Sequence, residues 1–146
     1  MKNIIKVFLI ILCVFLIIYI IFDVNKKRPI LTGYYDKAEY YQQGGFQDYT
    51  DYCKYYYKEE YDKSFEKSEL YTKVTDKNIG GILVFFNEFE KWMETSGRSN
   101  EYDFDIDSIN IEDYVYIDPE RNTLKNYTIY LYDTDTHTLY YIHSNI

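Results

Sequence analysis

The sequence predicts an α+β fold: an N-terminal transmembrane helix followed by a small domain in which one or two helices pack on a C-terminal antiparallel sheet of three or four strands. Three observations predict it. A long hydrophobic run lies near the amino terminus, a segment with helical periodicity follows in the middle, and strand-like segments fill the end of the chain. Helices that precede an antiparallel meander are typical of this class.

The hydrophobic run covers residues 4–22 and has the length of a membrane-spanning helix. Val7 to Phe22 contains sixteen apolar residues without a charge. At about 1.5 Å per residue, residues 4–22 span about 28 Å, close to the ~30 Å hydrocarbon core of a bilayer. A cleaved signal peptide has a shorter apolar stretch that ends in small residues, and none follows Phe22 here. We therefore expect a single-pass anchor that binds the membrane through residues 4–22.

Three parts are expected along the chain: a membrane anchor with basic flanks at 1–28, a linker at 29–45, and an acidic, tyrosine-rich α+β domain at 46–146. Lys and Arg residues flank both ends of the hydrophobic run in nearly equal number, so the positive-inside rule does not decide the orientation. Because the N-terminal tail is very short, we expect an uncleaved signal anchor. The expected localisation is the cell membrane, with the domain outside the cytoplasm.

Charge separates the anchor from the domain. Five basic residues and one acidic residue give residues 1–28 a charge of +4. Because the whole chain has a net charge of −8, the remaining residues carry −12. An acidic surface repels nucleic acid and anionic headgroups, which excludes DNA and RNA as partners. Tyrosine is the most unusual component, with 20 of the 146 residues. It combines apolar area and strand preference with a polar tip, although an AT-rich coding sequence would also account for its abundance.

Two helices are expected in the middle of the chain. Apolar residues recur at steps of three and four between Phe46 and Phe65, which indicates a helix, although the tyrosines of Tyr52–Tyr57 would also suit a strand. In the linker, Asp36–Gln43 has room for one or two helical turns. A second helix is predicted at 76–95, with Thr75 or Asp76 as its N-cap.

The second helix has the clearer pattern. Its apolar stripe consists of Ile79, Ile82, Leu83, Phe86, Phe89 and Met93. Ser96-Gly97 supplies its end, because glycine favours the left-handed conformation that terminates helices. We expect this helix to pack across the sheet.

The predicted sheet lies in the last third of the chain. One strand covers Asp113–Ile117 and ends in a turn at Asp118-Pro119. Two further strands, Tyr127–Tyr132 and Thr138–His143, flank a polar link and form a hairpin with a loop of four or five residues.

Alternating aspartates suggest a calcium loop at Asp103, Asp105 and Asp107. The EF-hand pattern requires Gly at its sixth position and Glu at its twelfth, where this chain has Ser108 and Tyr114. Solvated aspartates are therefore the preferred interpretation.

Asp133, Asp135 and His137 also alternate, but they lie where the hairpin must turn, and Asp is favoured in turns. We predict no metal, no cofactor and no catalytic residue.

Nucleophilic catalysis would have to combine Cys53 with His137 or His143, which are the only histidines. No residue near Cys53 in the sequence activates it, so a buried structural thiol is the preferred interpretation. The sequence has no Walker loop, dinucleotide turn or paired-histidine zinc motif. Glu88, Glu90 and Glu94 are interpreted as the solvated side of the second helix.

Tyr130, Tyr132 and Tyr140 are expected to share one face of the sheet. If exposed, such a face would suit protein or glycan contact, since tyrosine is rigid and amphipathic. If covered by the Phe86–Trp92 helix, it is core, and core is the preferred interpretation.

Two stretches, Gly45–Tyr57 and Thr138–Ile146, resemble short uncharacterised membrane-anchored proteins of low-GC Gram-positive bacteria. The resemblance implies a bacterial origin and an α+β domain outside the membrane, and it implies no activity.

Three functions are compatible with these features. We expect a non-enzymatic binding or accessory module of the bacterial cell envelope, with a protein or envelope partner. The alternative is a cytoplasm-facing component of a membrane complex, such as an immunity-type protein. An enzyme that uses Cys53 with a histidine is the least favoured.

Overall fold

The computed structural model describes residues 12–14, 35–44 and 49–146. The chain divides into two compact units, Met1–Gly33 and Tyr34–Ile146. In the first unit, residues 12–14 are helical, and the rest of the predicted anchor at 4–22 lies outside the described residues. Among the described residues, no helix has both the length and the apolar character needed to span a bilayer. The anchor therefore stays a prediction from the sequence.

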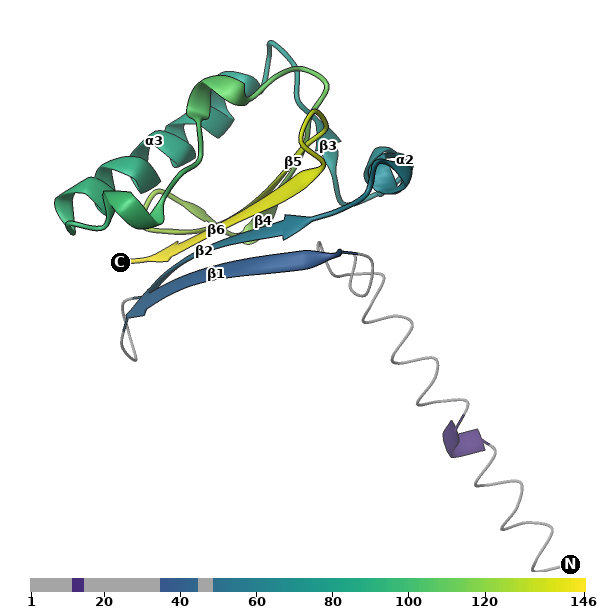
Figure 1. The fold of residues 1–146 in the computed structure, drawn as a ribbon, viewed down its shortest axis with the longest axis horizontal. Coiled ribbons are helices and arrows are strands. Elements are labelled where there is room, and N and C mark those ends of the chain that lie inside the picture. The colour runs from purple at the N-terminus through teal and green to yellow at the C-terminus, as the bar shows by residue number, and fades with distance from the viewer. Residues whose placement is uncertain (1–11, 15–34, 45–48) are drawn as a thin grey trace, which may run out of the picture. The chain divides into compact units, whose positions relative to one another are not determined.

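The second unit is an α+β domain built on one six-stranded antiparallel sheet, in the order β1-β2-β6-β5-β4-β3 (Figure 1). The strands are β1 (Lys37–Gly44), β2 (Tyr49–Tyr56), β3 (Thr72–Lys73), β4 (Tyr114–Thr123), β5 (Asn126–Asp133) and β6 (Thr138–Asn145). The helices are α2 (Asp62–Glu66) and α3 (Ile79–Thr95), with short 3-10 turns η1 (Glu59–Tyr61), η2 (Ser99–Glu101) and η3 (Ile106–Ser108).

The predicted C-terminal hairpin is confirmed as β5 and β6, which are joined by a four-residue turn. The strand before it does not end at Asp118-Pro119, as the sequence suggested. β4 continues to Thr123, and its register with β5 shifts between Ile117 and Asn122. A proline lacks the N–H of a regular ladder, and here it falls within the irregular stretch, where the loss is tolerated.

The largest departure from the sequence prediction is at 46–65, where Tyr49–Tyr56 form strand β2, the alternative that the tyrosines of Tyr52–Tyr57 allowed, and α-helix is confined to α2 at the end of the range. Residues 52–55 are all buried, because β2 lies between two strands and large neighbouring side chains, such as Tyr40 and Tyr102, pack on its two faces. Such a strand lacks the polar alternation of a half-buried one, so its apolar spacing imitates that of a helix. The helical turns expected at Asp36–Gln43 are likewise wrong, since β1 occupies that stretch and pairs along its length with β2.

The predicted helix at 76–95 is confirmed as α3. Four residues of its stripe are buried: Ile82, Phe86, Phe89 and Met93. It begins after a turn at 76–78, so neither Thr75 nor Asp76 is the N-cap, which is Asn78. The predicted end is confirmed: Gly97 has φ 72°, and the N–H of Arg98 donates to the carbonyl of Met93 at 2.8 Å.

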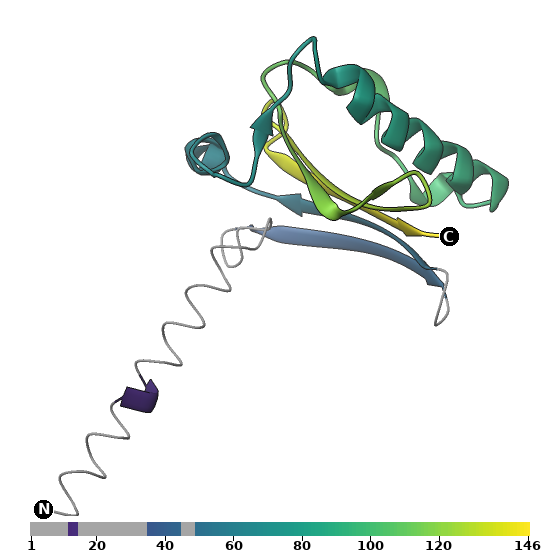
Figure 2. The same cartoon turned by 180° about the vertical axis from the view of Figure 1, so that it is seen from behind.

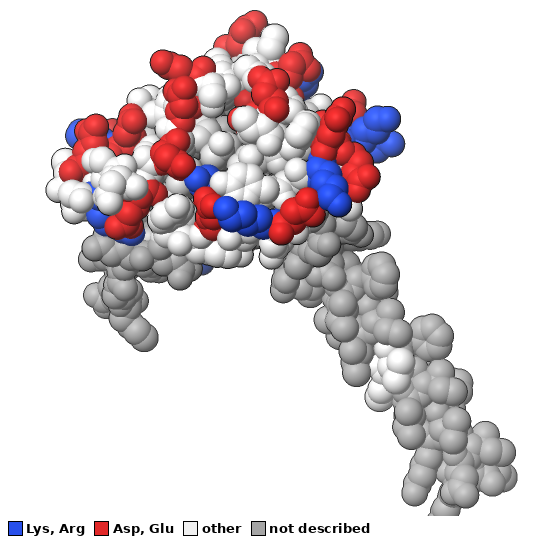
Figure 3. Space-filling view, in the orientation of Figure 1, with Lys and Arg blue, Asp and Glu red and all other residues white. Residues whose placement is uncertain are grey.

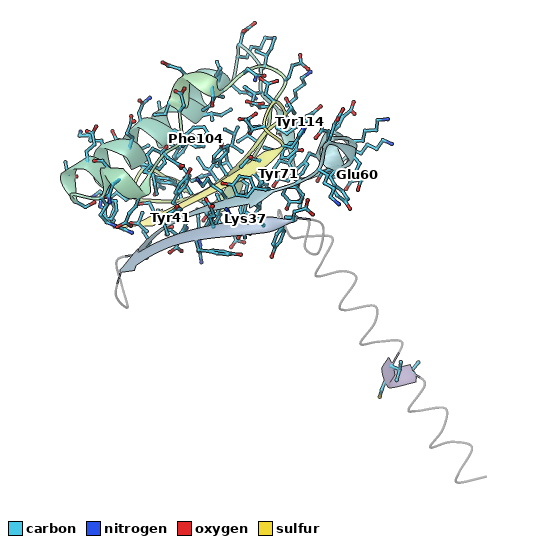
Figure 4. All side chains as sticks on the ribbon, viewed as in Figure 1. Lys37, Tyr41, Glu60, Tyr71, Phe104 and Tyr114 are labelled. Carbon is cyan, nitrogen blue, oxygen red and sulfur yellow. The ribbon has the colours of Figure 1, made fainter. Side chains whose placement is uncertain are left out.

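The two faces of the sheet are covered differently. α3 lies along one face, and Phe104 packs between it and the sheet (Figure 4). On the other face α2 covers one end, beside β3 and away from the C-terminus (Figure 2). Phe65 of α2 is fully buried there and stacks on Tyr132, with ring centroids 3.7 Å apart. Beyond α2, no helix among the described residues packs on that second face.

Candidate functional site

A single lateral row of side chains crosses the sheet on the face opposite α3. Tyr40, Cys53, Tyr141, Tyr130 and Tyr116 lie directly opposite one another on β1, β2, β6, β5 and β4. Residues that are directly opposite in an antiparallel pair project from the same face, so all five share it. We call these five residues the tyrosine row.

The tyrosine row is a nearly continuous aromatic surface. Tyr40 at the β1 edge is 54% exposed, and Tyr116, Tyr130 and Tyr141 are partly exposed. The ring centroids of Tyr130 and Tyr141 are 4.8 Å apart, and those of Tyr116 and Tyr130 are 5.9 Å apart. These spacings are typical of favourable aromatic pairs, so the rings support one another in fixed positions. Cys53, at 2% exposed, forms the floor between the two halves.

The phenols of Tyr116 and Tyr130 are neutral at physiological pH. Burial raises the pKa of Tyr130 and of Tyr116, and the carboxyl of Asp118 raises both further. Each hydroxyl therefore remains able to donate and accept hydrogen bonds. The row presents apolar ring area with polar tips.

Only one of the three tyrosines predicted to share a face contributes to this row. Tyr130 does so. Tyr132 lies on the same face but is buried under Phe65. Tyr140 lies on the α3 side, directly opposite Leu131, and its ring is 4.6 Å from that of Phe104. The prediction that Tyr130, Tyr132 and Tyr140 share one face is therefore wrong for Tyr140.

The next rung of the sheet holds Asp51, His143 and Thr128, again directly opposite one another. His143 is 1% exposed, its Nδ1 lies 2.7 Å from the hydroxyl of Thr128, and burial lowers its pKa. Burial raises the pKa of the Asp51 carboxyl, although His143 opposes this. Asp51 is half-buried and makes no hydrogen bond or ion pair with any residue that the structure describes.

The catalytic combination considered from the sequence is only partly assembled. Cys53 and His143 project from the same face in adjacent rungs, near Asp51. However, burial raises the pKa of the Cys53 thiol to about 12, and Asp51 adds to this effect. The thiol is therefore protonated, and a protonated thiol is a poor nucleophile. His137 lies elsewhere, in the β5–β6 turn, where its Nδ1 is 3.0 Å from Asp62.

The aspartates of the calcium candidate make protein contacts instead of converging. Asp103 accepts a hydrogen bond from the hydroxyl of Tyr52 at 2.9 Å and from Nζ of Lys54 at 2.6 Å. Asp105 accepts the backbone N–H of Asp107 at 3.0 Å. Within residues 12–14, 35–44 and 49–146, no group of three or more His, Cys, Asp or Glu side chains is placed to hold a metal ion.

The second group considered as metal ligands, Asp133, Asp135 and His137, forms the turn between β5 and β6 instead. Oδ1 of Asp133 accepts the backbone N–H groups of Asp135 and Thr136, at 2.9 and 3.0 Å. His137 has φ 53°, which closes the turn between β5 and β6. This is the local role in which aspartate is favoured in turns.

Lys54 is the centre of a buried ionic contact that the sequence did not reveal. It is 7% exposed, and its Nζ lies 2.6 Å from Asp103 and 3.1 Å from Glu39. The ammonium therefore joins β1, β2 and the loop after η2. Lys37, Lys54 and the hydroxyl of Tyr56 lower the pKa of Glu39 to about 2.

An apolar groove of about 580 Å³ opens between the first turns of α3 and β4. Its apolar lining includes Ile82, Phe85 and Ile117. Thr72, Lys77 and Asn78 are among its polar lining residues. None of the described residues that line the groove is a carboxylate, a histidine or a cysteine, so it lacks the groups that most often act as general acid, general base or nucleophile.

No protein-family model, curated protein or solved structure matches the chain.

Replacing Lys54 with Met should reduce the stability of the full chain in neutral detergent by about 1–2 kcal/mol at pH 7. The ion pair is lost, but Glu39 and Asp103 stay partly solvated, so the penalty is below that of a fully buried pair. Urea denaturation followed by Trp92 fluorescence measures it.

The dependence of stability on pH gives a second test of the Lys54 ion pairs. Folding lowers the pKa of Glu39 and Asp103, so their stabilising contribution is present above their unfolded pKa values and is lost as the pH falls from about 5 to 2. The loss should be shallower in Lys54→Met. Lys73→Met, which removes an exposed ion pair with Glu112, is the control and should destabilise less. Equal effects of the two substitutions would show that the Lys54 contact is unimportant.

Proposed function

We infer that this chain is a single-pass, membrane-anchored, non-enzymatic binding module of the bacterial cell envelope. Residues 4–22 are the anchor, the domain lies on the outer side of the cytoplasmic membrane, and the tyrosine row is the contact surface. The tyrosine row is the observation that carries this proposal.

Tyrosine suits a contact surface for physical reasons. It offers a large ring that loses little side-chain freedom on binding, together with a hydroxyl that pairs with polar groups of a partner. Most tyrosines of this chain that are fully buried, such as Tyr52 and Tyr132, pack under helices or loops. The row differs, because its four rings, on β1, β6, β5 and β4, are aligned across the sheet and stay partly exposed.

The chemistry of the face favours binding over catalysis. The Cys53 thiol is protonated and the imidazole of His143 is buried, so neither group is available to attack a substrate. A flat aromatic surface instead resembles the central part of a protein–protein interface, which is rich in tyrosine.

A cytoplasm-facing component of a membrane complex is the second candidate. The nearly balanced basic residues on the two sides of the hydrophobic run support either orientation. The contact surface would be the same, and only the compartment of the partner would change.

Site-specific photo-crosslinking in the native host tests the contact surface. With p-benzoylphenylalanine in place of Tyr40, irradiation of intact cells should give a discrete adduct. The matched control is Val84, which is 46% exposed on α3, on the other side of the sheet. An adduct at Val84 and none at Tyr40 would refute the row as the contact surface.

Labelling with a membrane-impermeant maleimide decides the orientation. Ser64→Cys places an exposed thiol on α2, whereas Cys53 is buried and should not react in the folded protein. We expect Ser64→Cys to be labelled in intact cells and the unsubstituted chain to stay unlabelled. Reaction of Ser64→Cys only after lysis would place the domain in the cytoplasm and favour the second candidate.

A further inference from the structure

We propose that the partner of the tyrosine row presents arginine side chains, which stack on the tyrosine rings and pair with the carboxylates of Asp51 and Asp118. This inference rests on the proposed function and names the chemistry of the partner.

The overall charge favours a cationic partner. Outside residues 1–28 the chain carries −12. Acidic side chains predominate over basic ones on the face of the domain shown in Figure 3. A field of this sign attracts cationic segments and repels anionic ones, including the lipid surface next to which the anchor would hold the domain.

Asp51 is the residue beside the tyrosine row that favours a cationic partner there. Its carboxyl is half-buried beside the row and has no hydrogen-bond or ion-pair partner among the described residues. A carboxylate that has lost water without gaining a partner is costly, and burial accordingly raises its pKa. His143, directly opposite, offsets this effect only in part, because burial lowers its own pKa and disfavours the charged imidazolium. A guanidinium that reaches Asp51 would satisfy this group.

Asp118 supplies a second carboxylate on β4, in the stretch after Ile117 where the register with β5 shifts. It follows Tyr116 on β4, and it raises the pKa of Tyr116 and of Tyr130 because it lies near both rings. Glu120 and Arg121 also lie near this end. Among the described residues, two carboxylates and one guanidinium thus act on the rings of Tyr116 and Tyr130.

The strands that carry the two aspartates set the length of the partner segment. Asp51 is on β2 and Asp118 on β4, with β6 and β5 between them. Three strand spacings of about 4.8 Å separate β2 from β4 by roughly 14 Å across the sheet. An extended segment that crosses the strands covers this distance in about four residues. Two arginines at positions i and i+4 therefore match Asp51 and Asp118, while the residues between them lie over the rings.

Arginine fits this face better than a second copy of the chain does. Its planar guanidinium stacks on aromatic rings and pairs with carboxylates at the same time. Two copies that met through this face would bring together two domains of −12 each and would leave Asp51 without a cation.

The test uses the full chain in dodecyl maltoside and a fluorescein-labelled Gly-Ser peptide with the core Arg-Gly-Ser-Gly-Arg. Its matched control replaces both arginines with glutamine. Fluorescence anisotropy at about 0.15 M ionic strength measures the affinity. The arginine peptide should bind at least tenfold more tightly than the glutamine peptide.

Substitutions then locate the site. Asp51→Asn should weaken binding about tenfold, whereas Asp76→Asn, which removes an exposed carboxylate next to α3, should change it less than twofold. Tyr141→Leu should weaken binding and Tyr141→Phe should not, because phenylalanine keeps the ring. Thermal denaturation by circular dichroism confirms that each variant is folded.

Each remaining outcome is informative. Equal losses in Asp51→Asn and Asp76→Asn, or equal affinity for the two peptides, would overturn the arginine site. An adduct at Tyr40 in cells without arginine binding would overturn this inference and leave the proposed function standing. If neither an adduct at Tyr40 nor arginine binding is found, this inference and the proposed function are both overturned. A dimer by analytical ultracentrifugation that Tyr141→Leu dissociates, without arginine binding, would replace the cationic partner with a second copy.

Discussion

The register between β2 and β6 is the constraint on which the rest of the structure depends. It joins the β1–β2 hairpin to the C-terminal meander, and it places Cys53 directly opposite Tyr141. A slip of one residue would turn every side chain of β2 to the other face. Tyr52 would then leave the core under α3, and Cys53 would leave the floor of the tyrosine row. The hydrophobic core and the candidate binding face are therefore fixed by the same pairing.

The two faces of the sheet are covered unequally, and for this reason some of the many tyrosines form a defined surface, the tyrosine row. α3 seals one face with Phe86 and Phe89, and α2 seals one end of the other with Phe65. The remainder of the second face keeps its rings partly exposed and includes Asp51, a half-buried carboxyl with no described partner. Core tyrosines are used for packing, whereas those of the row are held in place and left accessible. This contrast supports a binding function more strongly than the abundance of tyrosine does.

The sequence predicts what local periodicity and turn residues determine, and it fails where burial depends on distant strands. α3 and the β5–β6 hairpin were predicted, because a helical stripe and a polar turn are local signals. β2 was assigned to a helix because it is buried on both faces, so its polar alternation is missing. Tyr140 was placed on the wrong face because an uncertain loop length leaves the pairing partner undetermined. The row itself draws one residue from each of five strands, and no local pattern reveals such an alignment.

Disulfide trapping between β2 and β6 is the measurement that tests the central claim most directly. Cys53 supplies one partner, so the single substitution Tyr141→Cys creates the pair, and directly opposite residues lie within the Cα separation that a disulfide requires. Under mild oxidation, peptide mapping should find a Cys53 disulfide in Tyr141→Cys. Tyr140→Cys, whose side chain projects from the other face, should give none. A disulfide in Tyr140→Cys and none in Tyr141→Cys would contradict the register, and with it the tyrosine row.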